Sequence, residues 1–272
     1  MAGSLTPGMI AADIAQAFVD ARCKGGSLSA FPGPYPADLD EAYAIQKAAI
    51  ASSPRAIAGW KVGRLTPDLA ERFGVDRFIG PIFQGDVQEA RDGADADFPM
   101  FVGGSAAFEA EYMLVLGRDD TASGAAHSAE SASALVGAVR IGIEVAGSPL
   151  ATMPQCDSLA SIADFGNNNG AILGAEVPLS ALDDPAQLEC GTVIDDQLIR
   201  SASAADLPGG PLTAFAFALN MARELGHPLR AGQFVSTGAV TGMHPVRIGQ
   251  HGLADFGRWG WVACLVVPVG RA

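Results

Sequence analysis

The sequence predicts an α+β protein, with a small helical region over residues 1–80 followed by a β-rich domain over residues 81–272. Apolar residues recur at helical spacing in the first 55 residues, whereas from Ala56 onward short runs of period two are separated by Gly, Pro and Asp. Strands and helices do not alternate at βαβ length, and no GxGxxG or Walker loop occurs, which disfavours a doubly wound nucleotide-binding fold. With 272 residues, 49% of them hydrophobic, the chain is long enough to bury a full core as one large or two modest domains.

The first region contains two predicted helices and one short one. Thr6-Pro7 is a suitable N-cap and first helical position, and apolar residues from Ile10 to Ala21 follow at helical spacing. A loop rich in Gly and Pro over 25–37 leads to Asp38, which predicts the cap of a helix through about Ala51. The segment PDLAERFG predicts a short helix inside a soft boundary at 65–85.

The second region is predicted to be mostly strands. The clearest strand is 106–116, where Phe108, Ala110 and Tyr112 share one face and Glu109 and Glu111 share the other. A second strand is expected over 138–146, which includes Glu144. A helix over 211–225 ends at Gly226. Further strands are expected over 170–176, 190–195, 197–203, 233–241, 246–249 and 258–267.

Composition and charge narrow the class of protein. The formal net charge is -13, from 30 acidic and 17 basic residues, and no basic patch favours nucleic acid as a partner. An anionic substrate would be repelled unless a bound cation or a local base reverses the field. No apolar run approaches about 18 residues and the start does not resemble a secretion signal, so we expect neither a membrane span nor export. Four widely spaced cysteines without a CxxC pattern predict free thiols in a reducing cytoplasm.

Three glutamates carry the chemistry. On a strand, residues i and i+2 point to the same side, so Glu109 and Glu111 would stand about 7 Å apart on one face. Glu144 lies on another apolar strand, and three carboxylates converging from two strands suit a hard ion such as Mg²⁺ or Mn²⁺. The alternative is an ordinary solvent-facing pair of acids on an edge strand.

These residues lie in stretches that resemble a known family. FEAEYMLVLGRD (108–119) and RIGIEVAGSP (140–149) resemble the E-x-E … E metal signature of the fumarylacetoacetate hydrolase superfamily, in the branch of 2-keto-4-pentenoate hydratases and 4-oxalocrotonate decarboxylases. Four more stretches agree in order, so that the resemblance covers about residues 40–267: GWKVG (59–63), GVDRFIGPIF (74–83), SLASIADFGNNNGAILG (158–174) and PLTAFAFALNMARELGHPLRAGQFVSTGAVTG (211–242).

The resemblance implies a fold and a cofactor. It implies a mixed β-roll or β-sandwich catalytic domain with Mg²⁺ or Mn²⁺ held by Glu109, Glu111 and Glu144. It also implies a small-molecule 2-oxo acid substrate, a homo-oligomer, and a possible complex with a pathway decarboxylase. Two positions depart from the family pattern: Arg77 follows Gly74-Val75-Asp76 where a proline is usual, and Asn167 stands where a serine is usual.

The expected activity is hydration of a 2-hydroxy-2,4-dienoate in aromatic or steroid breakdown. A decarboxylase of a 2-oxo-3-enedioate and a metal-binding partner subunit without turnover are the alternatives. The family position of Lys61 suggests proton transfer or substrate anchoring, with a pKa lowered by burial near a metal; the alternative is a solvated strand lysine.

Four further residues are candidates for the site, each with a structural alternative. Asp76 could orient water or Lys61, or be a turn acid. Asp164 and Asn167 could contact the substrate or shape the site loop; the alternative is an ordinary turn-forming role. Thr237 could bind the substrate carboxylate or be a strand-end threonine.

Overall fold

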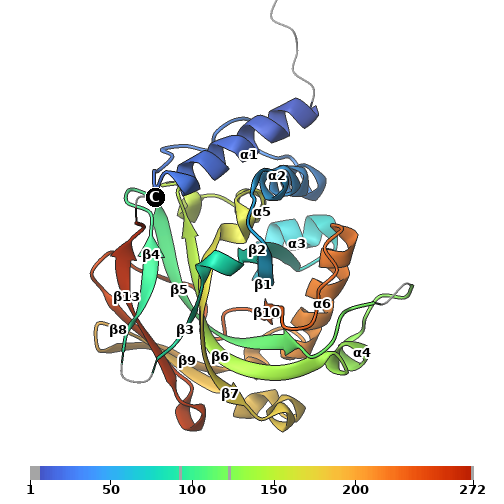
Figure 1. The fold of residues 1–272 in the computed structure, drawn as a ribbon, viewed down its shortest axis with the longest axis vertical. Coiled ribbons are helices and arrows are strands. Elements are labelled where there is room, and N and C mark those ends of the chain that lie inside the picture. The colour runs from blue at the N-terminus through green and yellow to red at the C-terminus, as the bar shows by residue number, and fades with distance from the viewer. Residues whose placement is uncertain (1–6, 92–93, 122–123, 271–272) are drawn as a thin grey trace, which may run out of the picture.

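The computed structural model describes residues 7–91, 94–121 and 124–270, and in these residues it shows an α+β fold built on two mixed sheets (Figure 1). The helices are α1 (Pro7–Cys23), α2 (Leu39–Ser52), α3 (Pro67–Phe73), α4 (Ala129–Ser133), α5 (Ser158–Ala163) and α6 (Gly210–Glu224). The first strands are β1 (Ile57–Arg64), β2 (Arg77–Phe83), β3 (Val87–Glu89), β4 (Ala96–Met100), β5 (Ser105–Leu116), β6 (Val136–Ser148) and β7 (Asn168–Val177). The later strands are β8 (Glu189–Ile194), β9 (Gln197–Ser203), β10 (Phe234–Ser236), β11 (His244–Pro245), β12 (His251–Asp255) and β13 (Trp261–Pro268).

The larger sheet has the strand order β2-β1-β10-β5-β6-β7-β3, with β11 added beside β5. The smaller sheet has the order β4-β13-β12-β8-β9. Most pairs are antiparallel, but β1 with β10, β3 with β7, and β4 with β13 are parallel. The sheets are therefore mixed, as the sequence predicted.

The long hairpin of β5 and β6 lies at the centre of the larger sheet. Its two strands pair antiparallel from Ser105 with Ser148 to Leu116 with Val136. Phe108, Ala110 and Tyr112 belong to the main apolar core on one face of β5, while Glu109 and Glu111 occupy the other face, as alternation requires. The predicted strand parity is thus confirmed.

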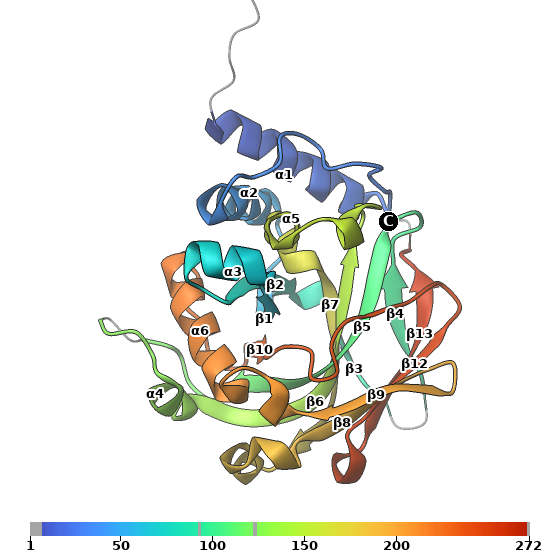
Figure 2. The ribbon, with the colours of Figure 1, turned by 180° about the vertical axis from the view of Figure 1, so that it is seen from behind.

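The helices cover the ends and one side of the larger sheet. In the two views (Figures 1 and 2), α1 and α2 lie across one end of the molecule, with α5 beneath them. The helix α6 packs against β1 and β2. Since β1 and the first half of β2 fall within residues 1–80 and belong to the same sheet as β5, the N-terminal region also contributes strands to this sheet.

Some predicted elements differ from the structure. The helices predicted from Pro7, from Asp38 and over 211–225 are present, although Thr6 lies outside the described residues. The strand predicted over 233–241 is wrong beyond Ser236, because the chain turns at Thr237-Gly238 toward the carboxylates. The strand predicted over 246–249 is also wrong. Residues 251–255 form β12 instead, whose apolar pattern of Leu253 and Ala254 is too short to stand out in the sequence.

Two absences concern the described residues alone. No helix within residues 7–91, 94–121 and 124–270 is long and apolar enough to cross a membrane. All four cysteines are free: Cys190 and Cys264 are buried, Cys156 is half-buried and Cys23 is exposed.

Candidate functional site

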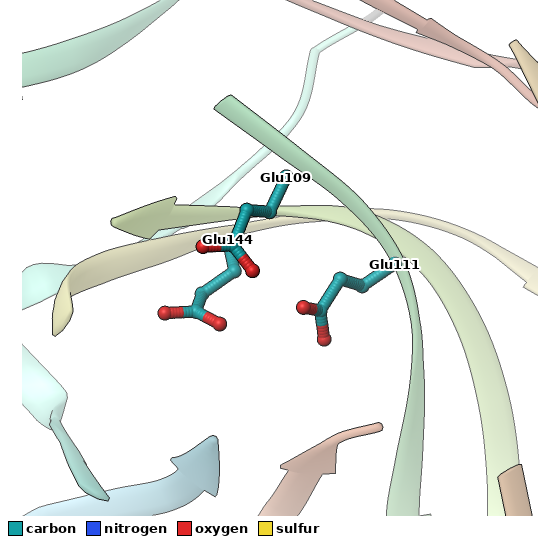
Figure 3. A group of neighbouring side chains, drawn as sticks. All are labelled: Glu109, Glu111 and Glu144. Atoms are coloured by element: carbon teal, nitrogen blue, oxygen red, sulfur yellow. The ribbon is translucent and has the colours of Figure 1, made fainter. Parts of the chain in front are cut away.

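The site is built on the face of the β5–β6 hairpin that carries the three glutamates. Strand register places Glu109 directly opposite Glu144, and Glu111 follows two residues along β5. All three carboxyl groups point into the same space (Figure 3), and one oxygen from each lies within 4.8 Å of the others. All three residues are buried. The predicted convergence of three carboxylates from two strands is therefore present.

Neighbouring strands orient two of these carboxylates. One oxygen of Glu111, Oε2, accepts hydrogen bonds from the Ser236 hydroxyl and from the backbone N–H of Gly238 at 2.8 Å. The Asn168 side-chain amide donates to Glu144 Oε1 at 3.1 Å. These donors come from β10, the loop after it, and β7, so the glutamate orientations depend on the whole sheet.

The remaining oxygens fit a divalent cation. Glu109 Oε1 and Glu111 Oε1 are buried and have no hydrogen-bond partner in the described residues. A buried anionic oxygen without a donor is costly, and a hard cation with oxygen ligands removes that cost. The donor set, three carboxylates and no sulfur or imidazole, favours Mg²⁺ or Mn²⁺ over Zn²⁺.

Mutual repulsion and burial perturb the acids. Burial raises the pKa of Glu109 to about 7, with Glu144 adding to the rise and Lys61 opposing it. Burial, together with the charges of Glu144 and Glu109, raises the pKa of Glu111 well above its usual range. Strongly perturbed carboxyl groups in a cavity wall are typical of functional sites.

Lys61 lies beside this cluster. Its ammonium Nζ is 3.1 Å from Glu144 Oε2, and both side chains are almost fully buried. Burial acts to lower the pKa of Lys61, as the sequence argument expected, but the nearby charges of Glu144, Glu109 and Glu111 outweigh burial and raise it. Without a metal the pKa of Lys61 is thus raised, because the carboxylates that bring Lys61 into the site also stabilise its charge. The lowered pKa expected beside a bound metal stays a prediction.

A tight turn over Phe165–Asn167 faces Lys61. Gly166 has a φ of 72°, and a Cβ there would lie 2.7 Å from the Gly80 Cα and 3.1 Å from the Lys61 Cδ. Only glycine allows this close approach of the turn to β2. Asn167 also adopts a left-handed φ of 59°, lines the cavity, and has a buried Oδ1 that accepts no hydrogen bond from another described residue.

Asp164 anchors this turn from beneath. Its side chain is fully buried, accepts from Arg22 Nε at 2.7 Å through Oδ1, and accepts from the Ser148 hydroxyl through Oδ2. Asp164 is absent from the cavity wall among the described residues. Of its two predicted roles, this placement favours the support of the site loop.

A cavity of about 600 Å³ lies beside the cluster, and among the described residues its wall includes Glu109 but neither Glu111 nor Glu144. Lys61 and Glu109 line it, and so does Thr237, whose hydroxyl donates to the Tyr112 carbonyl at 2.8 Å. Asp76 is 53% exposed, pairs with Arg77 at 3.4 Å, and is not among the described residues that line the cavity. The structure therefore groups Lys61, Asn167 and Thr237 with the glutamates and leaves Asp76 outside.

Sequence reasoning missed several supporting residues. Ser236 and Asn168 adjoin predicted candidates in the Ser-Thr-Gly and Asn-Asn-Asn stretches, so their position was a usable signal. No local sequence pattern marks Arg22, which contacts the site loop from α1, as a residue of the site.

Two curated enzymes are similar to the chain in sequence. No protein-family model matches the chain. It is 28% identical over 244 residues to the 2-keto-4-pentenoate hydratase of Paraburkholderia xenovorans (strain LB400) and to 2-keto-4-pentenoate hydratase 3 of Pseudomonas putida, covering 88% of this chain and 88% of each relative.

Solved structures match over a similar extent. The 4-oxalocrotonate decarboxylase from Pseudomonas putida G7, complexed with magnesium and adipate, matches with a TM-score of 0.77 and 20% identity over 97% of this chain and 99% of that one. A fumarylpyruvate hydrolase from Pseudomonas aeruginosa, in complex with Mn²⁺ and pyruvate, matches with a TM-score of 0.56 and 16% identity over 80% and 93% of the chains.

The sheets and the three-carboxylate site, with these matches, define the chain as a protein of the fumarylacetoacetate hydrolase fold. In sequence it resembles the 2-keto-4-pentenoate hydratases, as its motifs predicted.

Proposed function

We propose that this protein is a Mg²⁺- or Mn²⁺-dependent hydro-lyase that adds water to a 2-hydroxy-2,4-dienoate to give a 4-hydroxy-2-oxo acid. The observation that carries the proposal is the buried cluster of Glu109, Glu111 and Glu144 beside Lys61, next to a cavity that Glu109 and Lys61 line. The hydratases to which the chain is 28% identical support the same reaction class.

In this proposal the three glutamates hold the cation. When bound, a divalent cation polarises the 2-oxo group and offsets the charge of the substrate carboxylate. The glutamates are kept in place by the donors on Ser236, Gly238 and Asn168. An overall charge of -13 then does not prevent binding of an anion, since the local field is set by the cation and by Lys61.

Lys61 is the proton-carrying group of the proposal. Its Nζ holds three protons beside the carboxylates and lies on the cavity wall, so it can give a proton to the substrate at C5 during ketonisation. The proton lost from the 2-hydroxyl group replaces the one that Lys61 gives to C5, which leaves a 2-oxo-3-enoate with an electrophilic C4. Water then adds its oxygen to C4 and a proton to C3, which gives the 4-hydroxy-2-oxo acid. Asn167, with a free acceptor oxygen, and Thr237 are placed to contact the substrate or the incoming water.

Product analysis tests the reaction. Purified protein is incubated with Mg²⁺ and a panel of 2-hydroxydienoates and 2-oxo-3-enedioates, and the products are identified by NMR, with EDTA and Glu144→Gln as controls. A 4-hydroxy-2-oxo acid that forms only with metal supports the hydratase. Release of CO₂ from a 2-oxo-3-enedioate would instead identify the protein as the decarboxylase. Metal binding without turnover of any substrate would favour the partner-subunit alternative.

A further inference from the structure

The ratio of basic to acidic side chains along the cavity wall differs from that of the whole chain. Although the chain has 30 acidic and 17 basic residues, the cavity wall carries four basic side chains against three acidic ones. The basic ones are Lys61, Arg64, Arg77 and Arg200, and the acidic ones are Glu109, Asp157 and Asp206. Lys61 and Glu109 belong to the carboxylate site. The three arginines therefore form a separate positive region, the arginine end of the cavity.

The nearby acids are engaged elsewhere. Asp157 caps α5 by accepting from the Leu159 N–H at 2.9 Å, and it also accepts from the Tyr35 hydroxyl at 3.1 Å. Asp206 accepts from the Ser203 N–H at 3.1 Å. Neither acid forms an ion pair with a described arginine, so the charge of the arginine end is not neutralised by them.

Arg77 is the fixed member of this region. Its side chain is only 8% exposed, and its Nη2 donates to the Pro208 carbonyl and lies 3.4 Å from Asp76. Its Nε and Nη1 make no hydrogen bond to another described residue. A guanidinium held at one nitrogen, with further donors unused, can bind a carboxylate with little loss of side-chain entropy.

The other two arginines are exposed and unpaired. Arg64 pairs with Arg77 in strand register at the end of β1 and β2, and Arg200 comes from β9 in the smaller sheet. Neither guanidinium hydrogen-bonds or ion-pairs with another described residue. Positive side chains from both sheets thus line the same cavity.

The arginine end is separated from the carboxylate site along β1. Arg64 lies three residues beyond Lys61, which is about 10 Å along an extended strand. A short-chain dicarboxylate could therefore place one end at the cation and the other near the arginines. A substrate with an apolar tail would leave the Arg77 donors without a partner in a mostly buried position.

We infer that the arginine end is a second anion-binding subsite, which selects 2-oxo acids whose far end carries another carboxylate. Arg77 is the residue that binds this carboxylate, and Arg64 and Arg200 add positive charge around it. The inference rests on the proposed function, because it needs the first carboxylate and the 2-oxo group to lie at the glutamates. It narrows the substrate from any 2-hydroxydienoate to a dianionic one.

The test compares two saturated, unreactive ligands. 2-Oxoadipate and 2-oxohexanoate have the same carbon chain and differ in a terminal carboxylate or methyl group. Their affinities are measured by isothermal titration calorimetry with Mg²⁺ saturating. We expect wild-type protein to bind 2-oxoadipate about 10- to 100-fold more tightly, which is the range for hydrogen bonds to a charged group. Raising the salt concentration should weaken 2-oxoadipate more than 2-oxohexanoate.

Variants assign the preference to the arginines. Arg77→Gln should reduce the preference for 2-oxoadipate over 2-oxohexanoate to a few-fold, while the affinity for 2-oxohexanoate stays unchanged. Arg200→Gln, at an exposed position on β9, should reduce the preference for 2-oxoadipate partly. Arg230→Gln, which removes the same charge at an exposed residue outside the cavity wall, should leave it intact.

The outcomes separate the two proposals. Equal Mg²⁺-dependent affinities for both ligands in wild-type protein would overturn the subsite and leave the proposed function standing. An unchanged preference in Arg77→Gln and Arg200→Gln would also overturn it. If neither ligand binds in the presence of Mg²⁺, the proposed function fails and the subsite fails with it.

Discussion

Replacement of Arg22 by methionine should strongly destabilise the protein. Arg22 reaches from the last turn of α1 into the loop over 164–169, where its side chain is 7% exposed. It donates to Asp164 at 2.7 Å, to the Asn168 carbonyl at 2.8 Å and to the Gly147 carbonyl at 3.0 Å. Its guanidinium carbon also lies 5.3 Å from the ring centroid of Phe165 and 5.5 Å from that of Phe101.

The magnitude follows from the buried partner. Met keeps most of the side-chain volume, so the main loss is the charge beside a fully buried Asp164. Removing one member of a buried ion pair typically costs about 3–5 kcal/mol, because the other charge stays buried without compensation. Asn168 also orients Glu144, so a loosened loop should weaken Mn²⁺ binding as well.

Urea unfolding followed by circular dichroism measures this free energy. The double variant Arg22→Met/Asp164→Asn removes the uncompensated charge and should recover about half of the loss or more. Lys24→Met is a suitable control, since Lys24 pairs with Asp20 at 2.7 Å on the exposed surface close to the same helix end, and it should change stability little. A cost below about 1 kcal/mol for Arg22→Met, or a double variant no more stable than the single one, would refute the reasoning.

Three further predictions concern the carboxylate site. Glu109→Ala and Glu144→Ala should each weaken Mn²⁺ binding by orders of magnitude in a calorimetric titration while the far-ultraviolet spectrum stays native; wild-type affinity in either variant would remove that residue from the ligand set. Lys61→Met should lower turnover by about 10²–10⁴-fold with metal saturating. Its Mn²⁺ affinity should be equal or higher, because the ammonium 3.1 Å from Glu144 competes with a cation, and unchanged turnover would exclude Lys61 from the chemistry. Burial raises the pKa of Glu109 from its usual 4.5 to about 7. Between these pH values the metal-free native chain therefore binds more protons than the unfolded chain. The free energy of unfolding should then fall as the pH rises. Urea titrations in EDTA should show this fall in wild-type protein and a smaller one in Glu109→Gln; identical pH profiles would contradict the assignment.

Local sterics explain why much of the site could be predicted. Strand alternation depends only on the pleat of the chain, and it placed Glu109 and Glu111 on the face opposite Phe108 without knowledge of any neighbour. The same local signals located the helices α1, α2 and α6, whose apolar spacing and caps lie within a few residues of each other. They failed at β12, where five residues are too few to show a period.

Long-range packing decided the rest. The register that sets Glu109 opposite Glu144, the contact of Lys61 with that glutamate, and the pairing of Arg22 with Asp164 join segments that no local rule connects. The raised pKa of Lys61 is a case in point, since burial alone lowers it and only the three neighbouring carboxylates reverse the sign. The sequence by itself thus determined which residue types face the site and what ion they suit. Tertiary structure alone decided their partners, because a charge's energy depends on distances across strands that the order of residues does not contain.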